Sequence, residues 1–158
     1  MSLEQLPDNA RVWFFGSDRL LTDQEKSAIS LELKEFVSSW KAHGSELAAS
    51  FEILHDCILI VAVDENITPP TGCSIDKVFK LLEKQATNWF NRLLIWRAFC
   101  NTAKIYTIDE LRLALEDGEV DRETLIINPT VPTLKEVKES LYISINDSWV
   151  STKLVKQI

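Results

Sequence analysis

Four side chains of the types used in nucleophilic catalysis stand at predicted helix and strand ends in this chain. Cys73 directly precedes a predicted helix, where unpaired backbone amides and the helix dipole favour a thiolate. His43 is of the type that serves as a general base, and Asp64 or Glu65 is of the type that orients such a base. These residues predict a small cysteine-dependent hydrolase or transferase as one hypothesis.

The same stretch also predicts a site that binds without reacting. The backbone amides of residues 72–75 and the ammonium group of Lys77 offer partners to a phosphate or a carboxylate. This hypothesis is favoured because it needs neither a catalytic trio nor a cofactor, and its ligand is a small anion or a protein partner. The predicted ligand-binding residues are Gly72, Cys73, Ser74, Asp76, Lys77, His43 and Asp64.

Ordinary structural roles compete with both hypotheses. Ser74 is of the type that caps a helix, and Asp76 is a first-turn carboxylate that the helix dipole favours. His43, followed by Gly44, fits the C-terminus of a helix. Pooling the histidine, the cysteine and the two carboxylates named above gives no diagnostic ligand spacing, so no metal site is predicted.

Hydrophobic spacing predicts the elements that must position these residues. The order is strand, helix, strand, strand, helix, strand, which is typical of a ferredoxin-like α+β fold with both helices on one face of an antiparallel sheet. In that fold the first helix ends at the edge where the second begins, so the candidate residues are expected to converge. The predicted strands are 11–15, 47–54, 57–63 and 89–99, and the helices are about 23–42 and a second one capped by Ser74.

The strand at 57–63 is apolar on both alternations, which predicts cover on both faces of the sheet. Residues 101–158 are predicted to form a C-terminal α/β extension packed on a core of residues 10–100, within one compact domain. The predicted elements of this C-terminal extension are a strand at 103–106, a helix that begins with a capping box at Thr107, a strand at 125–128 and a helical turn at 134–140. If the extension leaves the sheet open, a homodimer is expected there.

Composition excludes several classes of function. The chain has 158 residues and a net charge of -7 without a Lys/Arg cluster, which disfavours a nucleic-acid partner. The longest apolar run is far shorter than the roughly 18 residues that suggest a membrane span, and no signal peptide opens the chain. The three cysteines, Cys57, Cys73 and Cys100, form no CxxC pair, which favours reduced thiols and a cytoplasmic location.

Several fragments resemble a family of short bacterial proteins that often carry the automatic label "ABC transporter ATPase". The matching pieces are 11–13, 40–44, 63–65, 72–77, 90–92, 107–111 and 147–149. A P-loop needs glycines followed by a Lys-Ser/Thr pair, and none of the four glycines of this chain precedes a lysine. The resemblance therefore implies a shared fold but no ATPase activity.

Overall fold

The protein belongs to the mixed α+β class, as predicted: the described residues form five α-helices, one short 3-10 helix and antiparallel sheets. The structure is a computed structural model that describes residues 1–92, 94–97 and 102–154, and gives only the backbone of 94–97 and 102. In the described part, no helix is both long enough and apolar enough to cross a membrane.

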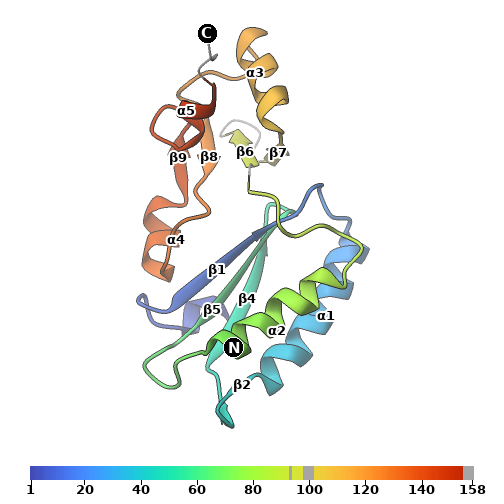
Figure 1. Cartoon of the computed structure of the whole chain (residues 1–158), viewed down its shortest axis with the longest axis vertical. Helices are drawn as coiled ribbons and strands as arrows, with labels where there is room; N and C mark the ends of the chain where they lie inside the picture. The colour runs from blue at the N-terminus through green and yellow to red at the C-terminus, as the bar shows by residue number, and fades with distance from the viewer. Residues whose placement is uncertain (93, 98–101, 155–158) are drawn as a thin grey trace.

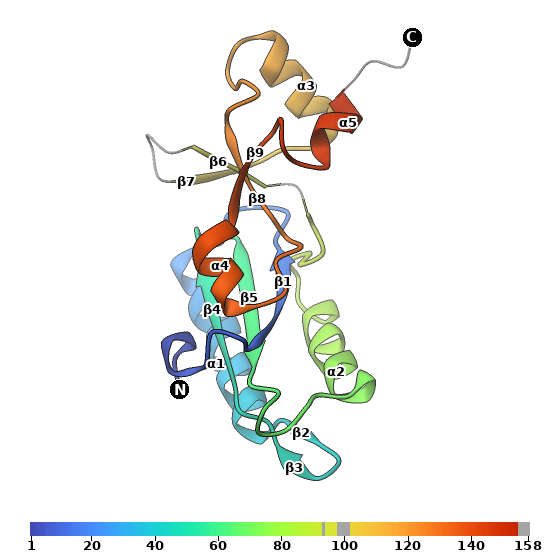
Figure 2. The same ribbon diagram turned by 90° about the vertical axis from the view of Figure 1, so that its left-hand side faces the viewer.

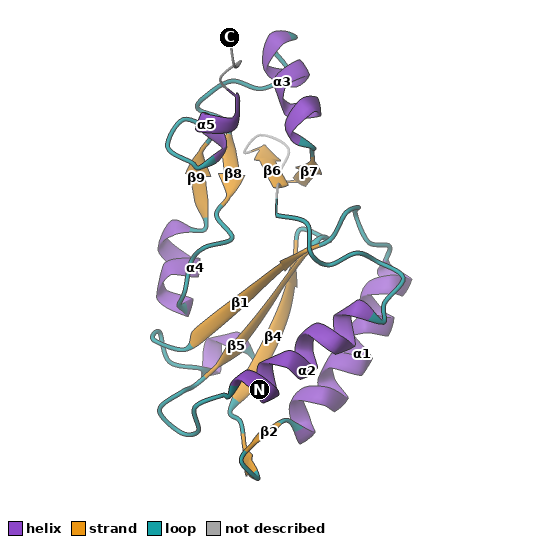
Figure 3. Cartoon of the chain, in the orientation of Figure 1, coloured by secondary structure: helices purple, strands orange, loops and turns teal. Residues whose placement is uncertain are grey.

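The N-terminal half of the chain forms a three-stranded antiparallel sheet (Figure 1). Its strands are β1 (Arg11–Gly16), β5 (Ile58–Val63) and β4 (Ala49–Leu54), in that spatial order. Helices α1 (Asp23–Ser39) and α2 (Gly72–Glu83) cover one face of this sheet (Figure 3). The central strand β5 therefore has a hydrogen-bonded neighbour on each side.

The prediction that the strand at 57–63 is covered on both faces is confirmed, since every residue of the corresponding strand β5 is buried. The helix-side core includes Leu33, Leu59, Val61, Val78 and Leu82. On the other face, Ile58, Ile60 and Ala62 pack with Val131, Leu134 and Leu141 from the C-terminal third. That cover comes from η1 (Leu3–Gln5) and α4 (Leu134–Ser140), and Figure 2 shows α4 on the side of the sheet opposite α1.

A second antiparallel sheet lies above the first in Figure 1. Its strands are β7 (Thr102–Ile105), β6 (Leu94–Arg97), β8 (Leu125–Ile127) and β9 (Tyr142–Ser144), in that spatial order. Helices α3 (Ile108–Glu116) and α5 (Val150–Leu154) pack around a separate core that includes Tyr106, Leu111, Ile126, Ile145 and Val150. The capping box at Thr107 and the helical turn at 134–140 are present as predicted.

The ferredoxin-like topology is not confirmed, because the strand order differs from the predicted one. Asn91, near the start of the strand predicted at 89–99, forms an isolated bridge with Gly16 of β1, but the strand β6 pairs with β7 and β8. The reason is local, since β6 and β7 are adjacent along the chain and pair most readily with each other. The predicted fold class was therefore right at the level of α+β and wrong in the fourth strand.

The end of the first helix also differs from the prediction. Helix α1 ends at Ser39, and Trp40 has an extended conformation with φ -74° and ψ 124°. A short hairpin of β2 (Lys41–Ala42) and β3 (Ser45–Glu46) follows, with His43 and Gly44 at its turn. Both turn residues have positive φ, 51° and 83°, as a two-residue hairpin turn requires. His43 is therefore a hairpin residue and not a helix C-terminus.

Candidate functional site

The start of α2 is fixed by a reciprocal pair of hydrogen bonds. The Thr71 hydroxyl accepts from the Ser74 amide at 3.2 Å, and the Ser74 hydroxyl accepts from the Thr71 amide at 2.7 Å. Thr71 is therefore the N-cap, and the prediction that Ser74 caps the helix was wrong. Ser74 lies one turn inside because the extended Thr71 can close this capping box.

The buried side chain of Trp40 stabilises this helix start with a hydrogen bond. The indole Nε1 of Trp40 donates to the Ser74 carbonyl at 2.9 Å, and Trp40 is only 2% exposed. Ser74 is also buried, with its hydroxyl bonded to Thr71. The predicted ligand residue Ser74 therefore lies under the helix start as part of its framework.

Two backbone amides remain open at this helix start. The amides of Thr71 and Ser74 are used in the capping box, and the Ile75 amide donates to the Thr71 carbonyl at 3.0 Å. Gly72 and Cys73 are exposed, and their amides donate to no group among the described residues. These two amides are the helix-terminal donors that an anion can reach.

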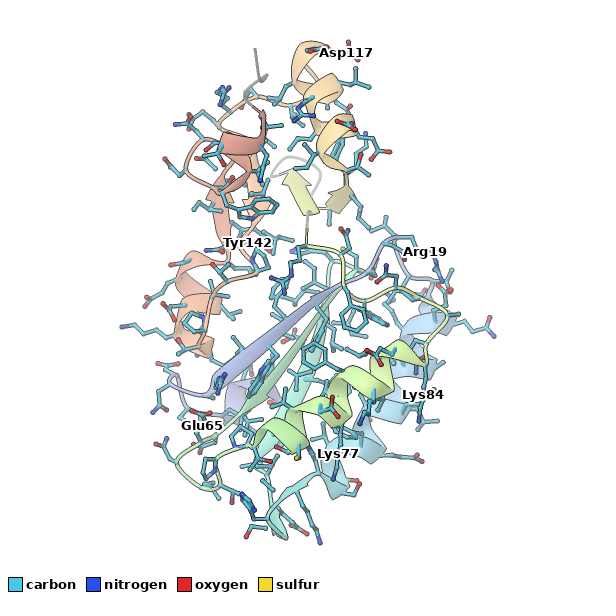
Figure 4. The ribbon with its side chains drawn as sticks, viewed as in Figure 1. Arg19, Glu65, Lys77, Lys84, Asp117 and Tyr142 are labelled. Carbon is cyan, nitrogen blue, oxygen red and sulfur yellow. The ribbon has the colours of Figure 1, made fainter. Side chains whose placement is uncertain are left out.

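The two charged residues of the first helical turns differ in their surroundings. Asp76 forms an ion pair with Lys80 at 2.6 Å, and this hydrogen bond raises the pKa of Lys80. Lys77 is exposed and forms no ion pair with any described residue. Figure 4 shows Lys77 towards the N-terminal end of α2 and Lys84 towards the opposite end. Lys77 is therefore the cation available near the two open amides.

The predicted carboxylates are engaged in the turn that follows β5. Asp64 is 9% exposed, and its carboxylate accepts from the Asn66 amide at 2.9 Å. Glu65 lies beside Arg11 of β1, with 3.3 Å between the charged groups. These contacts stabilise the turn and tie it to the first strand.

The structure places the predicted residues at one end of the sheet but does not join them into a triad. The end of α1, the end of β5 and the start of α2 lie at the same edge of the sheet (Figure 1). Yet no hydrogen bond between described residues links Cys73 to His43, or His43 to Asp64 or Glu65. No group of three metal-ligand side chains is assembled in the described part of the chain.

Sequence reasoning missed a cavity of about 330 Å³ beside β1. Aromatic rings form much of its wall: Phe15 and Phe79 lie 5.3 Å apart edge to face, and Phe79 and Phe90 stack at 5.9 Å. Its charged lining residues are Arg11 and Arg92. The sequence signal was present in the bulky runs 11–15 and 89–92, but both were assigned to paired strands.

Cys100 lies outside the described residues, so the predicted set of three thiols is seen only at Cys57 and Cys73, both free. Burial raises the pKa of the Cys57 thiol to about 12, whereas Cys73 is exposed.

Comparison of the chain with protein-family models, curated proteins and solved structures found no match. The resemblance to the short bacterial proteins therefore stays a prediction based on sequence fragments.

Proposed function

We propose that this protein is a non-catalytic binding domain that holds a small anion at the start of α2. The observation that carries the proposal is the pair of amides at Gly72 and Cys73, which donate to no described residue, one helical turn from Lys77, which forms no ion pair within the described part of the chain. A phosphate or carboxylate accepts hydrogen bonds from such amides and is favoured by the helix dipole. The same group carried by a protein partner presents the same chemistry.

Rigidity supports this proposal. The Thr71 capping box and the Trp40 contact hold the helix start from two directions, so the open amides point in fixed directions before a ligand arrives. A preorganised site loses less binding free energy to ordering the protein.

The free thiols of Cys57 and Cys73 support a reducing compartment, and we propose that binding takes place in the cytoplasm.

The test is a titration with inorganic phosphate, followed by amide chemical shifts at constant ionic strength. We expect saturable shifts centred on the Gly72 and Cys73 amides. Lys77→Ala is expected to weaken binding about 2- to 5-fold, since an exposed charge contributes up to about 1 kcal/mol. The matched control is Lys84→Ala, which removes the same charge from the other end of α2 (Figure 4).

Two results would contradict the proposal. The first is the absence of saturable shifts at Gly72 and Cys73, and the second is equal weakening by Lys77→Ala and Lys84→Ala. The alternative of a cysteine-dependent hydrolase or transferase stays a prediction, and no hydrogen bond from His43 to Cys73 supports it. Alkylation of Cys73 tests that alternative directly.

A further inference from the structure

The outer edge of β1, the side that faces away from β5, is paired at both ends and open in the middle. Next to its start, the Val12 amide donates to the Pro132 carbonyl at 3.0 Å, and the Leu134 amide donates to the Ala10 carbonyl. At its end, the Asn91 amide donates to the Gly16 carbonyl at 2.9 Å. Two separate segments therefore occupy the ends of the position where a fourth strand would lie.

Phe14 is the residue left without an outer partner. Backbone groups of an antiparallel strand point alternately to the two sides, so Ala10, Val12, Phe14 and Gly16 all face outward. The next outward residue, Asp18, donates its amide to the Asn88 carbonyl at 3.0 Å. In this series only Phe14 has no outer-edge hydrogen bond to a described residue.

The open backbone of Phe14 faces the aromatic cavity. The cavity lies along β1 between residues 89–92 and 129–132, the segments that close the two ends of the edge. Phe90 is 42% exposed although it stacks on Phe79. A donor and an acceptor without partners beside apolar walls gain more from a ligand than the same groups in open water.

The charge of the cavity is opposite to that of the chain. The chain carries a net charge of -7, yet the charged residues that line this cavity are Arg11 and Arg92. Arg11 already meets Glu65 at 3.3 Å, but both side chains are about half exposed, and such pairs are weak. Arg92 is exposed and has no ion pair with a described residue. The two cations stand near opposite ends of the open edge.

We propose that this cavity binds a short extended segment of an acidic peptide, which adds to β1 as a strand. A peptide backbone supplies both an acceptor for the Phe14 amide and a donor for its carbonyl. Between Val12, whose amide is already bonded to Pro132, and the bridge at Gly16, three positions of β1 remain, a span of about 10 Å at strand spacing. An apolar residue in the middle of the peptide packs on Phe79 and Phe90, and acidic residues on either side meet the two arginines.

This proposal is independent of the anion site at α2, because the two sites use different residues and different elements. The test uses acetylated, amidated tetrapeptides Glu-X-X-Glu, with X drawn from Val, Ile, Phe and Tyr. Binding is measured by calorimetry and by amide shifts of the whole protein. We expect saturable binding with Kd below about 1 mM for members of this set, and the largest shifts at Phe14 and its neighbours.

Two matched controls separate strand addition from simple charge attraction. A peptide N-methylated at the central residues keeps its charge and side chains but loses the backbone donors, and it should bind at least tenfold more weakly. Arg92→Gln should weaken binding about 3- to 10-fold. Arg122→Gln, which makes the same charge change outside the cavity, should leave binding unchanged. Because the peptide control uses the unaltered protein, it does not depend on the folding of a variant.

Several outcomes would overturn the proposal. They are no saturable binding of any peptide in the set, equal binding of the N-methylated peptide, or shifts centred on Gly72 and Cys73 instead of Phe14. A dimer that forms without peptide and protects the Phe14 amide would identify a second copy as the occupant, and it would also overturn the proposal. Failure of phosphate binding at α2 would leave these results unaffected.

Discussion

The start of α2 and the outer edge of β1 both present backbone groups that form no hydrogen bond with a described residue, but their surroundings differ. At α2 the open amides of Gly72 and Cys73 are exposed to solvent, above a helix start fixed by its cap. At β1 the amide and carbonyl of Phe14 face a cavity with aromatic walls. One region is an exposed and rigid terminus, and the other is a gap in a sheet.

This difference indicates what each region can gain from a ligand. Water satisfies an exposed helix amide at little cost, so a ligand there replaces one good partner with another. Beside apolar walls, water makes fewer hydrogen bonds, and a partner that supplies both a donor and an acceptor is worth more. We therefore expect weak binding of small anions at α2 and more selective binding at β1. Four predictions test this comparison.

The largest effect is expected at the wall of the β1 cavity. Trp89 is 1% exposed and belongs to the helix-side core, so Trp89→Ala should lower the free energy of unfolding by about 3–5 kcal/mol. Phe90→Ala, at a wall residue that is 42% exposed, should cost about 1 kcal/mol or less. Urea unfolding monitored by circular dichroism measures both. Equal losses would mean that the cavity wall is one continuous core with no room for a ligand.

The alkylation rates of two cysteines compare an exposed thiol with a buried one. The experiment uses a Cys100→Ser variant, so that only Cys57 and Cys73 can react. At pH 8, iodoacetamide should modify exposed Cys73 on the order of a hundredfold faster than buried Cys57, which reacts only when the protein opens. Mass spectrometry of quenched samples gives both rates. A Cys73 that reacts much faster than a free peptide thiol would instead support the nucleophile hypothesis.

The pH dependence of stability should report the enclosed thiol. Burial raises the folded pKa of Cys57 to about 12, above its ordinary value of 9.0. The stabilising effect of the neutral thiol is therefore complete below pH 9 and is lost as the pH rises towards 12. The stability difference between the protein and Cys57→Ala should shrink over that range. A constant difference would show that Cys57 is not shielded from solvent.

The smallest effect is expected at the cap of α2. Thr71→Ala removes the hydroxyl that accepts from the Ser74 amide, and it should cost about 1 kcal/mol of stability. Thr71→Ser keeps the hydroxyl and should restore most of that loss. Cys73→Ala, at the exposed neighbour, should change stability by less than about 0.5 kcal/mol. If Thr71→Ala had no effect, the rigidity assigned to the α2 start would be wrong.

Local signals explain which parts of the fold could be predicted. The capping boxes at Thr22 and Thr107 were read from four residues each, because both partners of a cap lie within one turn. The run of apolar residues at every position of β5 predicted a strand buried on both faces, because a strand with an exposed face would show polar residues at every second position. These features depend only on neighbours along the chain.

The parts that were predicted wrongly depend on distant contacts. Trp40 continues the apolar spacing of α1, yet it leaves the helix and bonds to Ser74. The same hydrophobic pattern suits a strand of either sheet, so it could not decide that β6 pairs with β7 and β8. The hydrogen-bond partners of the candidate residues were not predictable from spacing, because they lie far away along the chain.

The sequence by itself determined the α+β class, most helix and strand positions and the loop-to-helix switch at residues 71–77, because caps, turns and periodicity act over a few residues. Only the tertiary structure decided which sheet each strand joins. It also left Phe14, within the part of the chain that the structure describes, as the residue of the β1 edge without an outer hydrogen bond. The physical reason is that every residue except proline carries the same backbone donor. Whether it finds a partner depends on which distant segments reach it, here residues 88–91 and 132–134.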